Sequence, residues 1–203
     1  NKALLRHPQT GETVLERYLA AFPQHDTTVV VGYRAVAIMQ AFPQLEYVYN
    51  ANWRVTRSAY SLGLALDERP TVVLSSDFFF DGALAKRLVD GPPDCVVTVH
   101  KPSRSATATN VGLGDDGRVE SVYQGPVRSD VDPEAPGLFK VSSPAILRQW
   151  KRACLENGSS FALEHLPLDT ARIDALEIAT DALVEINHPL DYLAFIDNQR
   201  GAR

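Results

Sequence analysis

The stretch Thr71-Val72-Val73-Leu74-Ser75-Ser76-Asp77 decides the fold class of this chain. Its continuous apolar run is typical of a strand that is buried on both faces, as the strands of parallel sheets are. Asp77 follows where that strand ends, and Asp81-Gly82 then opens a helix that we expect to reach Asp90. The stretch therefore predicts an α/β fold with an acidic side chain at the carboxyl end of a buried strand.

Upstream of this strand, short apolar runs alternate with amphipathic patterns of helical period. The alternation predicts strands at 29–31 and 46–50 and helices at 12–22, 34–42 and 55–66. Each helix has about the length needed to cross back over a parallel sheet, so we expect a sheet built from βαβ units.

Downstream of Gly91 the pattern changes to strands without long helices between them. We expect strands at 95–100, 109–113, 118–123, 138–142 and 183–186, with helices at 144–156 and 189–196. Asp116-Gly117 is a hairpin turn signal, and 124–136, which holds three prolines, is a loop that leaves open the role of a lid. The economical interpretation is one α/β domain over 1–203 with an antiparallel excursion.

Composition and charge limit the classes of function. The chain has 203 residues, of which 45% are hydrophobic, and no apolar run approaches the roughly 20 residues that cross a bilayer. Twenty basic against 25 acidic residues give a net charge of −5, so broad binding to nucleic acid is excluded and any phosphate must be held locally. Cys95 and Cys154 lack the spacing of metal ligands. We expect a soluble, cytoplasmic protein with two inert thiols and no membrane or nucleic-acid partner.

Three segments carry side chains suited to phosphate chemistry, but none is specific alone. Asp77 could hold a divalent cation against phosphate oxygens, or it could be an ordinary turn or helix-cap aspartate. Lys2 by itself is typical of a surface lysine, and Glu185-Ile186-Asn187-His188-Pro189 is typical of a strand end before a capped helix. Their order along the chain is more informative than any one of them.

That order resembles the phosphocholine and phosphonate cytidylyltransferases of the sugar-phosphate nucleotidyltransferase superfamily, over nearly all of the chain. The matching motifs are Lys2-Ala3-Leu4-Leu5, Val29-Val30-Val31-Gly32-Tyr33, Tyr49-Asn50, Tyr60-Ser61-Leu62, Asp77 and Glu185-Ile186-Asn187-His188-Pro189-Leu190-Asp191-Tyr192. The resemblance implies a Rossmann-like, glycosyltransferase-A-like three-layer α/β fold with a mixed central sheet. It also implies transfer of CMP from CTP to a small phosphonate or phosphate monoester, with release of pyrophosphate.

The resemblance assigns residues to the nucleotide and its metal ion. Lys2 matches the family's phosphate-binding lysine, and Asp77 matches its Mg²⁺-binding aspartate. Asn187 stands at the second metal position, where the family usually has aspartate, so we expect weaker Mg²⁺ binding. The residues implied on the nucleotide side are Asn50, Arg57, Tyr60, Ser61 and Ser76. Tyr60 is explained equally well as a core residue, and the sequence does not distinguish cytosine from uracil.

The resemblance also implies an acceptor site. Lys101, beside His100 at the end of a strand, is the first choice for the acceptor's phosphate, although a solvated surface lysine explains it equally well; Lys140 and Arg104 are weaker candidates. Glu164 lies in the region that matches the choline-binding end of phosphocholine enzymes, but few aromatic residues surround it. Choline is therefore disfavoured, and the expected order of acceptors is 2-hydroxyethylphosphonate, 2-aminoethylphosphonate and phosphocholine.

The family opens with a strand and a glycine-rich loop that cradles the triphosphate, and nothing in this sequence matches them. We therefore expect residues 1–203 to lack this strand and loop, as in a domain cut from a longer enzyme. The bifunctional fosfomycin-pathway enzymes, which join a phosphoenolpyruvate mutase domain to a cytidylyltransferase domain, are the resemblance that suggests such a fusion. Two alternatives stay open: a sugar-1-phosphate nucleotidyltransferase that uses UTP or dTTP, and a domain that binds nucleotide without catalysis.

Overall fold

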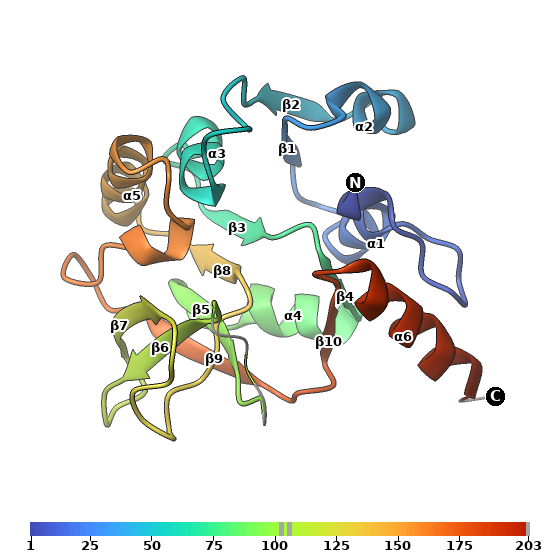
Figure 1. Ribbon diagram of the computed structural model, residues 1–203. Helices are drawn as coiled ribbons and strands as arrows, with labels where there is room; N and C mark the ends of the chain where they lie inside the picture. Colours follow the sequence, from blue (N-terminus) through green and yellow to red (C-terminus); the bar gives the residue numbers. More distant parts are fainter. Residues whose placement is uncertain (102–103, 105–106, 202–203) are drawn as a thin grey trace.

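A four-stranded mixed sheet forms the centre of the computed structural model, which describes residues 1–101, 104 and 107–201. Its strands, in spatial order, are β3 (Thr71–Leu74), β8 (Leu138–Val141), β5 (Cys95–Val99) and β9 (Asp174–Ile178). β8 runs antiparallel to both of its neighbours, whereas β9 runs parallel to β5 (Figure 1). The expected mixed sheet is therefore confirmed.

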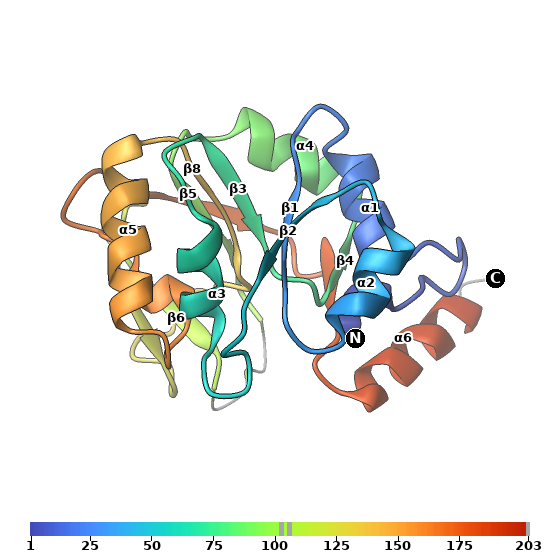
Figure 2. The same ribbon diagram turned by 90° about the horizontal axis from the view of Figure 1, so that it is seen from above.

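Smaller strand pairs surround this sheet. β1 (Thr28–Val31) is parallel to β2 (Glu46–Tyr49), β4 (Phe78–Phe80) is antiparallel to β10 (Leu183–Glu185), and β6 (Thr109–Leu113) forms a hairpin with β7 (Val119–Gln124). Gly117, with a φ of +75°, makes the expected hairpin turn. Within the described residues β1 pairs only with β2, and β3 pairs only with β8 (Figure 2). Both strands therefore keep one edge without a partner strand.

Helices cover both faces of the central sheet. In chain order they are η1 (Lys2–Leu4), α1 (Val14–Ala21), α2 (Ala35–Ala41), α3 (Ser58–Ala65), α4 (Gly82–Asp90), α5 (Pro144–Glu156), η2 (Ala162–His165) and α6 (Pro189–Gly201). Two helices begin as the sequence predicts. The side chain of Asp81 accepts a backbone N–H from the first turn of α4. The side chain of Ser143, the residue before Pro144, accepts one from the first turn of α5. No helix in the described part of the chain is long and apolar enough to cross a membrane.

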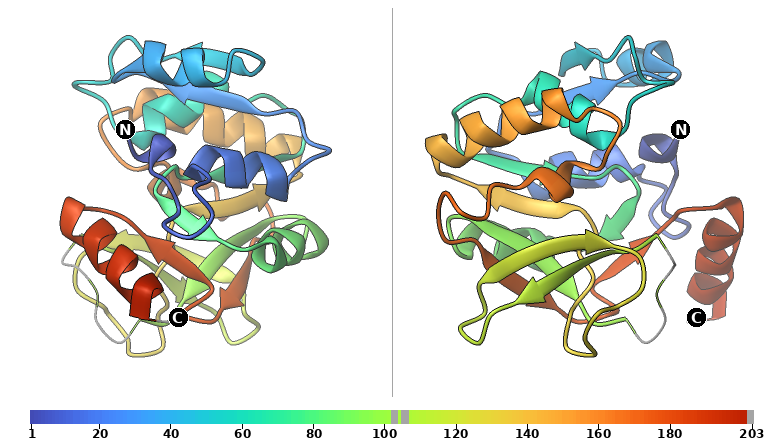
Figure 3. Two further views of the ribbon diagram at one scale, coloured as in Figure 1. Left: turned by 90° about the vertical axis from the view of Figure 1, so that its right-hand side faces the viewer. Right: turned by 60° about the vertical axis from the view of Figure 1, so that its left-hand side comes forward.

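The core divides into clusters on the two faces of the sheet. Val96 and Phe139 point toward α3 and α5, where they pack with the fully buried Trp150. Val97 and Leu138 point the other way and pack with α1, α4 and β4. These two clusters produce the three layers of the predicted fold (Figure 3). A third, smaller cluster joins β1 and β2 to α1 and α2.

The pattern of the sequence predicts neither β4 nor β9. Phe78–Phe80 reads only as an apolar segment after Asp77, and Asp174–Ile178 mixes acidic and apolar residues because its strand lies at the edge of the sheet. The expected parallel pairing is confirmed for β1 and β2, whereas β3 pairs with neither of them among the described residues and lies antiparallel to β8. The prediction that this strand is buried on both faces is wrong, because all four residues of β3 are only half-buried and one edge of β3 has no partner strand among the described residues. A continuous apolar run does not specify which strand lies next to it.

Backbone hydrogen bonds to β5 and β6 hold the end of the 124–136 loop in place. The backbones of Glu134 and Val99 exchange hydrogen bonds of 2.8 and 2.9 Å, and the N–H of Ala135 donates to the carbonyl of Thr109 over 2.8 Å. Asp132 and Glu134 are buried, whereas Val131 is 70% exposed. The end of the loop is therefore part of the fold and not of a lid.

Candidate functional site

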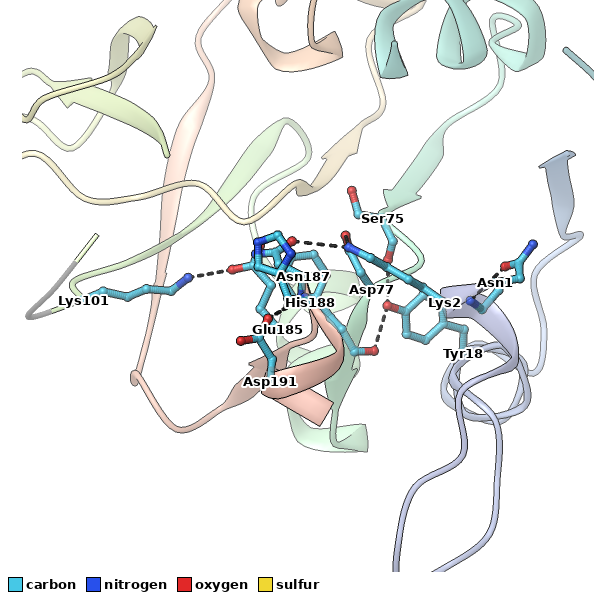
Figure 4. A network of polar contacts seen from close by, with 12 residues as sticks. Asn1, Lys2, Tyr18, Ser75, Asp77, Lys101, Glu185, Asn187, His188 and Asp191 are labelled. Atoms are coloured by element: carbon cyan, nitrogen blue, oxygen red, sulfur yellow. Dashed lines mark hydrogen bonds and ion pairs between the residues drawn. The ribbon is translucent and has the colours of Figure 1, made fainter. Parts of the chain in front are cut away.

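Three segments that lie far apart in the sequence meet at one point. The ammonium nitrogen of Lys2 in η1 lies 3.1 Å from Oδ2 of Asp77 and 3.3 Å from Oδ1 of Asn187 (Figure 4). Asp77 lies in the turn between β3 and β4, and Asn187 lies in the turn between β10 and α6. The fold thus brings together the lysine and both oxygen ligands that the resemblance singles out.

The turn that carries Asp77 is fixed from two sides. The hydroxyl of the buried Tyr18 in α1 donates to the carbonyls of Ser75, over 2.7 Å, and of Phe78, over 3.0 Å. The carbonyl of Asp77 itself accepts the N–H of Ile186 over 2.8 Å. Burial raises the pKa of the Tyr18 phenol far above its usual value, so the hydroxyl stays protonated and keeps its role as donor.

The turn that carries Asn187 is also preorganised. Oδ2 of Asp191 accepts the backbone N–H groups of Asn187 and His188 over 2.8 and 2.7 Å. The side-chain amide of Asn187 donates to Oε1 of Glu185 over 2.7 Å, and this contact turns its carbonyl oxygen toward Lys2. Asp191 therefore fixes the backbone that carries Asn187.

The carboxyl group of Asp77 is buried and only partly neutralised by its neighbours. Burial raises its pKa above the usual range, the adjacent Lys2 ammonium opposes that shift, and Glu185 adds to it. Its Oδ1 atom is buried and has no hydrogen-bond partner among the described residues. A buried carboxylate oxygen without a donor is costly, so this atom favours a bound cation.

Asp77 and Asn187 fit the type of magnesium site in which the substrate's phosphate oxygens supply the remaining ligands. The described residues contain no group of three or more His, Cys, Asp or Glu that could hold a metal ion. Mg²⁺ at phosphate sites commonly takes one or two protein oxygens and completes its shell with phosphate oxygens and water. The free Oδ1 of Asp77 and the Oδ1 of Asn187 match that requirement.

Lys101 is held by two carboxylates. Its ammonium nitrogen lies 2.8 Å from Oε1 of Glu134 and 2.8 Å from Oε2 of Glu185. Burial lowers the pKa of Lys101, but the hydrogen bonds to these two glutamates outweigh burial and raise the pKa above its usual value. Two carboxylates more than balance its charge, so Lys101, the first choice for the acceptor's phosphate, is neither a free cation nor a solvated surface lysine. Glu185 belongs to the motif Glu185–Tyr192 that carries the resemblance. Glu134 lies in the predicted 124–136 loop, and no sequence pattern indicated that it would contact Lys101.

Four of the five residues implied on the nucleotide side lie in α3 or in the loop that precedes it. Asn50 is 2% exposed, and its amide donates to the hydroxyls of Thr56 and Ser61 over 3.0 Å each, so Asn50 shapes the loop from inside. Tyr60 is half-buried. The exposed guanidinium of Arg57 stacks on Phe161, with 4.9 Å between its Cζ and the ring centre. Ser76 is exposed in the turn before Asp77.

Other predicted acceptor residues lie elsewhere or have partners. Lys140 donates to the carbonyls of Val89 and Gly91 over 2.7 and 2.9 Å, at the carboxyl end of α4, so the structure does not bring it to the site. Glu164 lies in η2, which packs against α3 and α5 on the nucleotide side. Arg104 donates to Oδ1 of Asn110 over 2.9 Å. His100 is exposed at the end of β5 and stays available.

Comparison with known proteins identifies the fold. A scan against protein-family models finds no match, and a search of curated proteins finds none either. The structure of the CTP:phosphocholine cytidylyltransferase from Streptococcus pneumoniae is 14% identical, covers 98% of this chain and 89% of its own, and has a TM-score of 0.72.

Two further solved structures have the same shape. The inositol-1-phosphate CTP transferase from T. maritima is 13% identical, with coverage of 97% and 86% and a TM-score of 0.68. The nucleoside-diphosphate-sugar pyrophosphorylase from Vibrio cholerae RC9 is 14% identical, with coverage of 97% and 91% and a TM-score of 0.70. The chain therefore has the nucleotidyltransferase fold along nearly its whole length.

Proposed function

We propose that this chain is an enzyme that transfers CMP from CTP to a small phosphonate or phosphate monoester and releases pyrophosphate. The observation that carries the proposal is the contact of Lys2 with both Asp77 and Asn187 on a nucleotidyltransferase fold. The similarity to two structures whose names specify CTP supports the choice of nucleotide. Two free, buried thiols suit a reducing compartment, so we also propose that the protein acts in the cytoplasm.

The proposed reaction needs positioning and charge neutralisation more than proton transfer. The second ionisation of a phosphate monoester has a pKa of about 6, so an oxygen of the acceptor is already a nucleophile at neutral pH. That oxygen attacks the α-phosphorus of CTP, and the bond between the α-phosphorus and the bridging oxygen of pyrophosphate breaks. Lys2 stabilises the charge on the α-phosphate oxygens, and Asp77 and Asn187 would hold the Mg²⁺. When bound, the metal ion supplies neutralisation of the phosphate charge.

On the nucleotide side, we propose that Tyr60 and Ser61 contact the base and ribose and that Arg57 and Ser76 contact phosphate. Asn50 supports these residues by fixing the loop ahead of α3. On the acceptor side, Lys101 lies between Glu134 and Glu185, and the exposed His100 precedes it in the chain. These carboxylates favour an acceptor that carries an ammonium group, so 2-aminoethylphosphonate ranks beside 2-hydroxyethylphosphonate as the first acceptor to test.

We propose that residues 1–203 form one domain to which a further strand and a glycine-rich loop can add. The unpaired edges of β1 and β3 support this proposal, because apolar strand edges are normally paired or covered. Such a strand would join the two sheets, and its loop would reach the same edge as Asp77.

The test is pyrophosphate release, measured for CTP, UTP, dTTP and ATP against 2-hydroxyethylphosphonate, 2-aminoethylphosphonate, phosphocholine and glucose 1-phosphate. We expect turnover with CTP and a phosphonate, and loss of at least about a thousandfold in Asp77→Ala with the same circular dichroism spectrum. Turnover with UTP or dTTP and glucose 1-phosphate would instead support a sugar-1-phosphate nucleotidyltransferase, which the Vibrio cholerae structure favours. Near-normal activity of Asp77→Ala would overturn the site.

A further inference from the structure

A row of polar side chains runs from Lys101 to the candidate site. The ammonium nitrogen of Lys101 lies 2.8 Å from Oε2 of Glu185, and Oε1 of the same carboxylate accepts the side-chain N–H of Asn187 over 2.7 Å (Figure 4). Oδ1 of Asn187 in turn lies 3.3 Å from the ammonium nitrogen of Lys2. The two oxygens of Glu185 therefore serve two different donors.

This row matters because the two ends of a carboxamide differ in chemistry. The oxygen of Asn187 can bind a cation, whereas its NH₂ group is a donor only and faces a cation unfavourably. The two ends have nearly the same size, and Asn187 is exposed, so packing does not distinguish them. Hydrogen-bond partners must therefore decide which end faces Lys2 and Asp77.

Glu185 is the partner whose contact does not compete with a bound cation. Lys2 also favours the carbonyl end while it donates to Oδ1, but a cation that takes Oδ1 competes with that contact. Glu185 binds the opposite end of the amide. An ionised carboxylate accepts hydrogen bonds and donates none, so Glu185 is satisfied only when the NH₂ group of Asn187 faces it.

Lys101 restricts the side chain at position 185 in the same way. Its ammonium is also held by the buried Glu134, over 2.8 Å. Because an ammonium only donates, the end of side chain 185 that faces Lys101 must be an oxygen. A carboxylate has a second oxygen left for Asn187. A carboxamide at position 185 would instead turn its NH₂ group toward Asn187 and so reverse the asparagine amide.

We infer that Glu185 and Lys101 are positioning residues that keep the carbonyl oxygen of Asn187, and not its NH₂ group, on the side where a divalent cation would bind between Asn187 and Asp77. The inference rests on the proposed function for this cation site, but Mn²⁺ binding can be measured without turnover. It gives Lys101 a role that does not require contact with the acceptor.

The experiment is calorimetric titration of Mn²⁺ at pH 7.5 into the wild-type chain, Glu185→Gln, Lys101→Met and Lys101→Met/Glu185→Gln, each with an unchanged circular dichroism spectrum. We expect Glu185→Gln to weaken Mn²⁺ binding at least about tenfold, because the NH₂ group of Asn187 then faces the cation. The double variant should bind within about threefold of Lys101→Met, because without the ammonium the carboxamide at position 185 can present its oxygen to Asn187.

Glu134→Gln is the matched control. It removes the same charge from the other carboxylate on Lys101, and it leaves the contact between Glu185 and Asn187 in place. We expect it to change the Mn²⁺ affinity less than about threefold.

Asn187→Asp provides a second background, because an ionised aspartate has an oxygen at both ends and needs no orientation. In that background Glu185→Gln should change the Mn²⁺ affinity less than about threefold. A purely electrostatic effect of Glu185 would lower the affinity by the same factor in both backgrounds, and that result would overturn the inference.

Unchanged Mn²⁺ affinity in Glu185→Gln would also overturn the inference, as would a wild-type chain that does not bind Mn²⁺. A double variant as weak as Glu185→Gln would overturn the role of Lys101. The inference and the proposed function fail separately. CMP transfer by the wild type with unchanged Mn²⁺ affinity in Glu185→Gln would remove only the inference, whereas the expected Mn²⁺ affinities without any transfer would remove only the proposed function.

Discussion

Lys2 contacts the same two side-chain oxygens that we propose as ligands of a magnesium ion. Its ammonium is within 3.1 Å of Asp77 and 3.3 Å of Asn187, the two residues proposed to hold Mg²⁺. A cation that binds there must displace this ammonium or share the oxygens with it, and either process costs free energy. Nucleotide binding would relieve the competition, because the α-phosphate attracts the same ammonium.

Lys2→Met should therefore bind a divalent cation more tightly in the absence of nucleotide, by roughly tenfold, while losing turnover. Titration with Mn²⁺ by calorimetry at pH 7.5 measures the affinity. Lys86→Met, which removes an exposed lysine paired with Asp90, is the matched control. Unchanged Mn²⁺ affinity in Lys2→Met would show that Lys2 and the metal ion do not share a position.

Arg34 offers a test of the strain that its left-handed backbone conformation costs. Glycine adopts the left-handed conformation without the penalty of about 1–2 kcal/mol that other residues incur, but it loses about 0.5–1 kcal/mol through its freer unfolded chain. Arg34→Gly should then raise the free energy of unfolding by about 0.5–1 kcal/mol, as measured by urea denaturation. Arg54→Gly, at a position without positive φ, should lower it. A decrease for Arg34→Gly would mean that the contact of the Arg34 side chain with the Tyr33 ring stabilises the fold by more than the strain costs.

At the scale of elements, the loop between η1 and α1 connects the start of the chain to β4 and α6. The ring of His7 lies edge-on to Phe79 and Phe195, at centre distances of 5.6 and 5.2 Å. Burial lowers the pKa of His7 below its usual 6.5, and the nearby Arg17 adds to this shift. The folded state therefore disfavours the protonated ring, whereas the unfolded chain accepts the proton freely.

The sign of this shift gives a pH dependence. The stability contributed by neutral His7 is complete above pH 6.5, the ordinary value, and is lost as pH falls through the lowered pKa of the folded state. We expect the urea midpoint to fall between pH 7.5 and pH 5, and His7→Phe to reduce that fall. His100→Phe, at an exposed histidine, is the control. An equal fall in the wild type and His7→Phe would contradict the prediction.

The elements differ in how well local sequence predicts them. The starts of α4 and α5 are encoded by Asp81 and by Ser143-Pro144, and the structure confirms both, because caps depend on neighbours within one helical turn. β9 escapes prediction because its residues alternate poorly and its position is set by parallel pairing with β5, about 80 residues earlier in the chain. Whether residues 174–178 form a strand therefore depends on β5, a distant segment that the local sequence pattern does not include.

At the scale of the whole molecule, β1 and β2 form a unit that is less tightly held than the central sheet. They pair only with each other within the described residues, and they pack on the smallest of the three buried clusters. A two-stranded sheet is marginally stable unless it packs against other elements. By contrast, all five residues of β5 are buried between β8 and β9.

Hydrogen exchange should reveal this difference. Amides of β1 and β2 should exchange through local opening, at least about tenfold faster than amides of β5, which open only with the whole domain. Exchange followed by mass spectrometry of peptides that cover these strands measures both rates. A longer chain that carries the proposed extra strand should show slower exchange in β1. Equal protection of β1 and β5 would contradict the view of a separate, weaker unit.

The sequence by itself determined the residue types and their order: Lys2 near the start, Asp77 after an apolar strand and Asn187 before the last helix. These features follow from local periodicity and from a resemblance in motif order, and the structure brings the three together. Only the tertiary structure decided that Glu134 and Glu185 balance Lys101, that Lys140 caps α4, and that Arg34 and Arg54 lie against the rings of Tyr33 and Trp53. Charge partners depend on distances between residues far apart in the chain, and those distances are fixed by how the sheets and helices pack.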